Sequence, residues 1–147
     1  MTRREEVWIA AGALVLAGGI RIAATQAPKD TTKSGTGWTI PADANTEKNP
    51  VAGDADAAQA GKQLFNSNCK RCHGPGGKGD GPDADPEYQE DMDLTNPARA
   101  SKNPDGVVFY KVWNGRQKPK MPPFKDKLTK DQVWQIVSFV QTLRGAS

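Results

Sequence analysis

The spacing of apolar residues predicts three helices in the second half of the chain. Apolar side chains between residues 57 and 65 recur every three or four positions, the period of an amphipathic helix, and Asp54 gives this helix an acidic start. A second group of apolar positions lies between residues 107 and 113, after Pro104 and before Gly115. Because proline favours the first turn of a helix and glycine favours its end, this group predicts a second helix.

The third predicted helix begins after Thr129 and ends at Gly145. Gln132 stands three positions after Thr129, which is the spacing of a capping box, and seven large apolar residues follow it. No alternating strand pattern of any length is present, and turn-forming Gly and Pro are frequent in residues 74–93, between the first two helices. We therefore predict an all-α fold with long loops.

The start of the chain has a different pattern, typical of a membrane-directed segment. Residues 7–20 form an apolar run of 14 residues, and a helix of that length covers about 21 Å of a hydrocarbon core about 30 Å thick. Adding residues 21–24 gives 18 residues, and the long side chain of Arg21 can reach the headgroups. We therefore expect residues 1–25 to form one N-terminal transmembrane helix with its basic start in the cytoplasm.

A secretory signal peptide is the alternative interpretation of these residues. It shares the basic start and the short apolar region, and Thr25, Gln26 and Ala27 would form the small-residue segment at its cleavage site. In both interpretations the rest of the chain is exported.

Residues 26–53 predict an extended linker. They are rich in Pro, Gly, Thr, Asp, Asn and Lys, and Trp38 and Ile40 are their largest apolar side chains. Because this composition cannot bury a core, we expect a tether that lets a domain move clear of the membrane. The alternative is an ordered strap that packs on a partner subunit through Trp38.

The charge and composition of the whole chain narrow the class of protein. A net charge of +3 and a pI of about 8.9 are too mild for a general nucleic-acid binder. The 15 Gly and 11 Pro among 147 residues indicate sparse regular structure. This length allows one small domain preceded or followed by a further segment, and we assign the domain to residues 54–147.

The only two cysteines and the only histidine of the chain, Cys69, Cys72 and His73, fall within five residues. This is the attachment sequence of a c-type haem, because two thiols on one turn can bond the same porphyrin and the following imidazole can bind its iron. A zinc site would need further Cys or His ligands, and a thioredoxin-type pair expects a strand where a helix is predicted here. We therefore predict one covalently bound haem c, with its iron, at these three residues.

Further motifs surround the attachment sequence. They are Gly61-x-x-x-Phe65, Gly74, Gly79-Asp80-Gly81-Pro82, Trp113-Asn114-Gly115, Met121-Pro122-Pro123-Phe124, and Trp134 in the closing helix. In this order and spacing, residues 54–147 resemble a class I monohaem cytochrome c. The resemblance implies the cytochrome c fold, whose first and last helices cross, here with Gly61 and Phe65 against residues 139–143. It also implies that the carbonyl of Pro82 accepts a hydrogen bond from His73.

Met121 is the predicted second axial ligand. A soft, neutral thioether suits an iron whose potential is positive enough for respiratory or photosynthetic electron transfer. Besides Met1, the chain offers Met92 and Met121. Two prolines stiffen the loop after Met121, whereas Met92 lies between two aspartates in a segment that we expect to be solvated.

With an imidazole and a thioether on its two faces, the iron would have no open position for a substrate. We therefore expect a carrier of single electrons, with no enzymatic activity and no small-molecule substrate. The alternative is a five-coordinate haem sensor or peroxidase, and the chain has no second histidine to serve as its distal group. By position alone, the candidates for holding the haem propionates are Arg99, Lys102, Trp113 and Arg116.

Charge is distributed unevenly within the domain. Residues 80–93 contain seven acidic and no basic residues, whereas residues 111–130 contain seven basic residues and one acid, Asp126. The basic segment brackets Met121, whose loop covers one haem face in the family. We therefore expect it to steer the partner, a membrane electron-transfer complex with an acidic docking surface, toward the haem edge.

Together these features predict an electron carrier anchored in a bacterial inner membrane by a single span, with the haem domain on the periplasmic side. It would pass electrons between membrane complexes of respiration or photosynthesis. Two alternatives stay open. One is a fixed cytochrome subunit of an oxidase, a quinol-oxidising complex or a photosynthetic reaction centre, and the other is a soluble periplasmic carrier released by signal cleavage.

Overall fold

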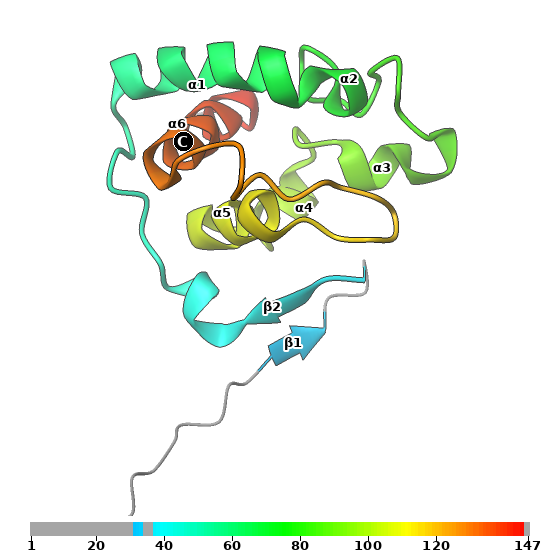
Figure 1. Cartoon of the computed structure of the whole chain (residues 1–147), viewed down its shortest axis with the longest axis horizontal. Helices are drawn as coiled ribbons and strands as arrows, with labels where there is room; N and C mark the ends of the chain where they lie inside the picture. Colours follow the sequence, from blue (N-terminus) through cyan, green and yellow to red (C-terminus); the bar gives the residue numbers. More distant parts are fainter. Residues whose placement is uncertain (1–30, 34–36, 146–147) are drawn as a thin grey trace, which may run out of the picture.

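The structure is a computed structural model that describes residues 31–33 and 37–145 (Figure 1). Within these residues, three longer helices, three one-turn helices, two 3-10 turns and a two-stranded ribbon are joined by long loops. In chain order they are β1 (Thr31–Lys33), β2 (Thr39–Pro41), η1 (Ala42–Asn45), α1 (Ala55–Asn68), α2 (Lys70–His73), η2 (Pro86–Tyr88), α3 (Gln89–Met92), α4 (Pro97–Ala100), α5 (Asp105–Asn114) and α6 (Lys130–Leu143). The three predicted helices are confirmed as α1, α5 and α6.

The crossing of α1 and α6 is the most extensive contact between helices, with α1 along one edge of the domain and α6 between α1 and α5 (Figure 1). Gly61 lies against the backbone of α6, where a Cβ atom would come within 1.9 Å of the Gln135 carbonyl oxygen. One turn later, Phe65 is 1% exposed and packs on Phe139 with 5.2 Å between ring centroids. The predicted contact between the first and last helices is therefore confirmed. Gly61 meets α6 at Gln135, one turn before residues 139–143, where the contact was expected.

The ends of these helices have the caps that their sequences predict. The Thr129 hydroxyl oxygen accepts a hydrogen bond from the backbone N–H of Gln132 at 3.2 Å, and the Gln132 side chain accepts one from the Thr129 N–H at 2.9 Å. At the start of α1, the Asp54 carboxylate accepts hydrogen bonds from the backbone N–H groups of Asp56 and Ala57. These bonds satisfy donors that the first turn of a helix leaves without partners.

Helix α5 completes the main core. Phe109 stacks between two tryptophans, with ring centroids 4.2 Å from Trp134 of α6 and 5.8 Å from Trp113. The buried members of this cluster are Phe65, Val108, Phe109, Val112, Phe124, Leu128, Val133, Trp134, Ile136, Val137, Phe139 and Val140. The haem attachment sequence and Met121 are both joined to this core, which therefore positions the site.

Residues 37–53 do not form the extended linker predicted for residues 26–53. Trp38, Ile40 and Ala44 are buried and form a second apolar cluster with Val107 of α5. The prediction was wrong because it considered only whether the segment could form a core by itself. Its few apolar side chains can still be buried when a helix of the domain provides the apolar surface against which they pack. Trp38 does anchor an ordered strap, as the alternative predicted, but it packs on the same chain. The pairing of β1 with β2 in an antiparallel ribbon was not predicted.

The predicted anchor or signal peptide, residues 1–25, lies outside the described residues, as do residues 26–30. Among the helices that the structure does describe, none has both the length and the apolar character that crossing a bilayer requires.

Candidate functional site

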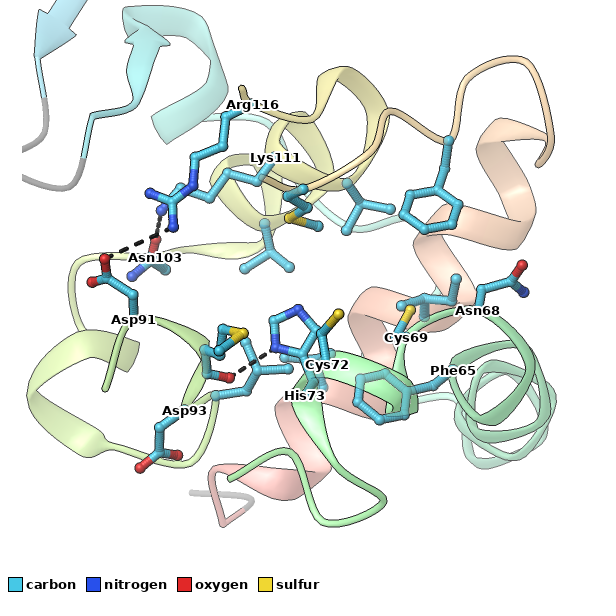
Figure 2. Close-up of a pocket in the computed structure, with 18 of the residues that line it drawn as sticks. Phe65, Asn68, Cys69, Cys72, His73, Asp91, Asp93, Asn103, Lys111 and Arg116 are labelled. Carbon is cyan, nitrogen blue, oxygen red and sulfur yellow. Dashed lines mark hydrogen bonds and ion pairs between the residues drawn. The ribbon is translucent and has the colours of Figure 1, made fainter. Parts of the chain in front are cut away.

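The end of α1 and the short helix α2 place both cysteines and the histidine on one turn. The Cys69 N–H donates to the carbonyl of Phe65 at 2.8 Å, and the N–H groups of Cys72 and His73 donate to the Cys69 carbonyl at 3.2 and 3.0 Å. All three side chains line the same cavity (Figure 2). No disulfide joins the two sulfurs, so both can bond a porphyrin. The structure thus brings together the three predicted attachment residues.

The orientation of the His73 ring is fixed by one hydrogen bond. Its Nδ1 atom lies 2.8 Å from the backbone carbonyl oxygen of Met92, at the end of α3. A carbonyl oxygen can only accept, so Nδ1 carries the proton and donates it. Burial lowers the pKa of His73, although this hydrogen bond opposes the change. The imidazole is therefore neutral at neutral pH, and its Nε2 lone pair is available to bind iron.

The carbonyl of Pro82 does not make this bond, so that prediction was wrong. The loop around Pro82 lies against the backbone of the attachment turn instead: Gly81 N–H donates to the Cys72 carbonyl at 3.3 Å and Asp83 N–H to the Arg71 carbonyl at 2.7 Å. These bonds hold the loop against the main chain of the turn, and Met92 takes the role expected for Pro82. Pro82 does not line the cavity.

Met121 is held in the loop that follows α5. Arg116 and Met121 exchange two backbone hydrogen bonds, of 2.8 and 2.9 Å, and the Phe124 N–H donates to the Val112 carbonyl at 3.1 Å. Met121 is half-buried and lines the same cavity as His73. This loop is therefore fixed on both sides of the predicted ligand by bonds to α5 and to itself.

Met92 also lines the cavity, contrary to the expectation that its segment is solvated. Its carbonyl oxygen lies at Nδ1 of His73, so Met92 belongs to the wall on the histidine side. A haem bound through His73 would need its other protein ligand from a different wall of the cavity. The structure therefore gives Met92 a role in orienting His73 and leaves Met121 as the candidate ligand.

The walls of the cavity are mostly apolar and come from α1, α5, α6 and the loops around them. The apolar side chains that line it are Trp38, Phe65, Met92, Leu94, Val108, Val112, Pro119, Met121, Pro122, Phe124, Ile136 and Val140. An apolar wall excludes water from a porphyrin and favours the less charged state of its iron.

Charged side chains gather at one end of the cavity, away from Phe65 (Figure 2). Arg99 donates to Asp91 at 2.5 Å, and Arg116 lies 3.8 Å from the same carboxylate. Lys111 donates to the Asn103 side chain at 2.5 Å, and Arg144 donates to the Asn103 carbonyl at 2.9 Å. Burial, together with the nearby charges of Arg116, Arg99 and Arg144, lowers the pKa of Lys111 to about 8.

This charged end suits the two carboxylates of a haem. Arg99 and Arg116 are paired with Asp91 there, and Lys111 and Arg144 lie close to them, so further anionic groups would reduce the repulsion among these cations. Of the residues predicted to hold the propionates, Arg99 and Arg116 line the cavity, whereas Lys102 and Trp113 do not. The sequence analysis missed Asn103, Lys111 and Arg144, which only the fold brings together. The cavity therefore fits the predicted haem in its thiols, its imidazole, its apolar walls and its cationic end.

Comparison with known proteins gives the same family. The sequence profile of cytochrome c matches residues 58–144. Cytochrome c6 of Leptolyngbya boryana is 34% identical over 88 residues, which are 58% of this chain and 91% of that protein. Among solved structures, the KustC0563 c-type cytochrome is 26% identical, with 58% of this chain and 94% of that one covered and a TM-score of 0.44.

The profile match spans more than half of the chain and includes most of α1, the attachment turn, α5, Met121 and all of α6. Proteins of this family transfer electrons through their haem. The chain belongs to the class I cytochrome c family and carries one covalently bound haem c with its iron.

Proposed function

We propose that this protein carries single electrons between redox proteins and is not an enzyme. The observation that carries the proposal is that His73 and Met121, each held by backbone hydrogen bonds, line one cavity. The haem supplies the one-electron change of oxidation state. With both side chains bound to its iron, no position is open to oxygen, peroxide or another substrate. The residues of this chain then have three tasks: to hold the group, to orient it and to exclude water.

Carbon monoxide tests this closed site, because it binds reduced haem iron only at an open position. We expect the visible spectrum of the reduced native protein to change slowly or not at all. Met121→Ala should bind carbon monoxide at once, whereas the matched control Met92→Leu should behave like the native protein. An immediate shift in the native protein would favour the five-coordinate sensor or peroxidase instead.

The surface around Met121 supports a partner with an acidic docking surface. Lys118, Lys120, Lys125 and Lys127 are exposed, and none of them forms a salt bridge within residues 37–145. Lys120 also lines the cavity that holds His73. The contact of Lys120 with the cavity, and the position of the other three lysines in the loop of Met121 or just after it, support docking on this side, since charges steer association over longer distances than apolar contacts do.

Charge reversal tests this surface. Lys118→Glu combined with Lys120→Glu should slow electron exchange with the partner at low salt, and the difference from the native protein should disappear as salt is added. Lys48→Glu combined with Lys62→Glu is the matched control, because both side chains are exposed and neither lines the cavity. Equal rates for the two double variants at every ionic strength would exclude steering by this surface.

We further propose that the protein is anchored in a bacterial inner membrane, with the haem domain in the periplasm. The apolar run of 14 residues after a basic start supports the anchor. A signal peptide would instead release a soluble carrier, and the mass of the mature protein distinguishes the two. Co-purification with one complex in mild detergent would favour a fixed subunit over a mobile carrier.

A further inference from the structure

The segment before the family domain is bound to that domain at both of its ends. This segment, residues 37–53, is called the strap below, and the profile match begins only at residue 58. At its far end, the Asn49 side chain donates to the Ser138 hydroxyl of α6 at 2.8 Å, and that hydroxyl donates to the Val51 carbonyl at 3.1 Å. In between, Ala44 packs so closely on α5 that a Cβ at Gly106 would lie 2.3 Å from its carbonyl oxygen. The strap is therefore part of the folded domain.

Trp38 lies at the near end of the strap and is the strap residue that lines the cavity. Its side chain is 7% exposed and belongs to the cluster against which Met121 packs. The ammonium of Lys111 lies 5.2 Å from the centre of the indole ring, and the guanidinium of Arg116 lies 4.8 Å from it. Both distances are those of cation–π contacts, so the indole ring touches the two cations as well as the hydrophobic cluster.

Arg116 connects Trp38 to the predicted ligand. Its backbone forms both hydrogen bonds of the pair with Met121, while its side chain lies over the indole. A single side chain outside the matched family segment thus contacts the loop of the ligand, two cations and the cavity.

We propose that Trp38 is a positioning residue that closes the Met121 side of the haem cavity and holds Lys111 and Arg116 at its rim. The inference rests on the proposed ligation by Met121. It assigns to the strap a function in setting the redox properties of the haem, which goes beyond holding the domain together.

Two consequences follow from elementary electrostatics. An indole that excludes water from the thioether side keeps the surroundings apolar, and cations held nearby disfavour the more positive, oxidised state of the iron. Both effects raise the reduction potential. Loss of the indole should therefore lower the potential and should let Met121 leave the iron more often.

Three variants of the full chain separate this role from simple stabilisation. Trp38→Ala removes the ring, Trp38→Phe keeps an aromatic face in its place, and Ile40→Ala removes a side chain that is 5% exposed in the same cluster but does not line the cavity. The measurements are the reduction potential, the rate of carbon monoxide binding to the reduced protein, and hydrogen exchange of the strap amides.

We expect Trp38→Ala to lower the potential and to bind carbon monoxide about tenfold faster. A tenfold change corresponds to a loss of about 1.4 kcal/mol in the equilibrium between the states with Met121 on and off the iron. Trp38→Phe should recover most of both properties. Ile40→Ala should speed hydrogen exchange in the strap while the potential stays at its native value. If Trp38→Ala yields no holoprotein, the comparison of Trp38→Phe with Ile40→Ala decides, since the smaller ring of Trp38→Phe should still lower the potential slightly whereas Ile40→Ala should not lower it at all.

Two results would overturn the inference. One is an unchanged potential and an unchanged carbon monoxide rate in both Trp38 variants, and the other is an equal change in the Trp38 variants and in Ile40→Ala. Failure of the proposed function looks different, because the native protein itself would then bind carbon monoxide at once.

Discussion

Gly61 shows how one residue sets the geometry of the whole haem domain. Two helices can cross at backbone distance only where a side chain is missing, and α1 meets α6 where a Cβ would come within 1.9 Å of the Gln135 carbonyl oxygen. Backbone on both sides of this contact leaves no flexible group that could move away. Because α1 leads directly into Cys69, a displacement of α1 would also displace the attachment turn.

Gly61→Ala should therefore destabilise the protein strongly. Overpacking of a filled core costs about 1–3 kcal/mol, and we expect the upper end of this range because the obstacle is main chain. Denaturant unfolding of the holoprotein measures it. Gly76→Ala is the control, since no atom lies within 4 Å of its added Cβ, and it should change the free energy of unfolding by less than about 0.5 kcal/mol. Equal losses in both variants would contradict the close crossing.

Asp91 is the carboxylate to which two of the cavity cations, Arg99 and Arg116, are paired. Its negative charge stabilises the more positive, oxidised iron, so Asp91→Asn should raise the reduction potential. A unit charge acting across about 10 Å at an effective dielectric constant of about 20–30 contributes about 1–1.7 kcal/mol, or about 40–70 mV for one electron. Potentiometric titration measures the shift.

The control for this charge is Asp83→Asn. Asp83 is paired with Arg71 on the surface and does not line the cavity, so its loss should leave the potential nearly unchanged. A potential that falls in Asp91→Asn, or that rises equally in both variants, would show that the carboxylate does not act on the iron through its charge.

The sequence was sufficient for the residues whose chemistry is local. Cys69, Cys72 and His73 were predicted together because the attachment turn is five residues long and needs no tertiary information. The partner of the His73 ring was not, because a backbone carbonyl has no signature in a sequence, and the resemblance therefore pointed to Pro82. The cationic end of the cavity was predicted only in part because α5, α4 and the end of α6 meet there only after folding.

At the scale of elements, α6 has the most complete local signal. Its capping box pairs Thr129 and Gln132 in both directions, and its buried face supplies much of the main core. Thr129→Ala should destabilise the protein by about 1 kcal/mol, since the N–H groups of the first turn lose their acceptor. Thr129→Ser keeps the hydroxyl and should lose little. Denaturant unfolding measures this difference as a shift of the midpoint, provided that the dependence of the free energy of unfolding on denaturant is the same in all three proteins. A Ser variant as unstable as the Ala variant would contradict capping by the hydroxyl.

Elements differ in how far a sequence predicts them. Helices α1, α5 and α6 each contain ten residues or more, so their periodicity and caps are visible locally. Helices α2, α3 and α4 have four residues each, which is too short for a period. The strap was missed for a different reason. Its apolar residues Trp38, Ile40 and Ala44 become a core only against Val107, more than sixty positions away in the chain.

At the scale of the whole molecule, the strap shortens the distance over which the haem domain can move. The apolar run with its extension ends at residue 24, and the β1–β2 ribbon begins at residue 31. The six residues between them span at most about 20 Å even when fully extended. In the proposed anchored form, the domain therefore stays close to the bilayer, in contrast to the long tether expected when all of residues 26–53 were taken as linker.

A short tether gives a high effective concentration at complexes in the same membrane. This concentration falls with about the −3/2 power of linker length, so inserting 20 Gly and Ser residues between Ala27 and Pro28 should slow electron delivery by a carrier roughly tenfold. The re-reduction rate of the haem in membrane vesicles after an oxidant pulse measures the effect. The same 20 residues appended after Ser147 are the control and should change nothing. A fixed subunit would keep its rate with either insertion, because its interface holds the domain in place, and this outcome would exclude the mobile carrier.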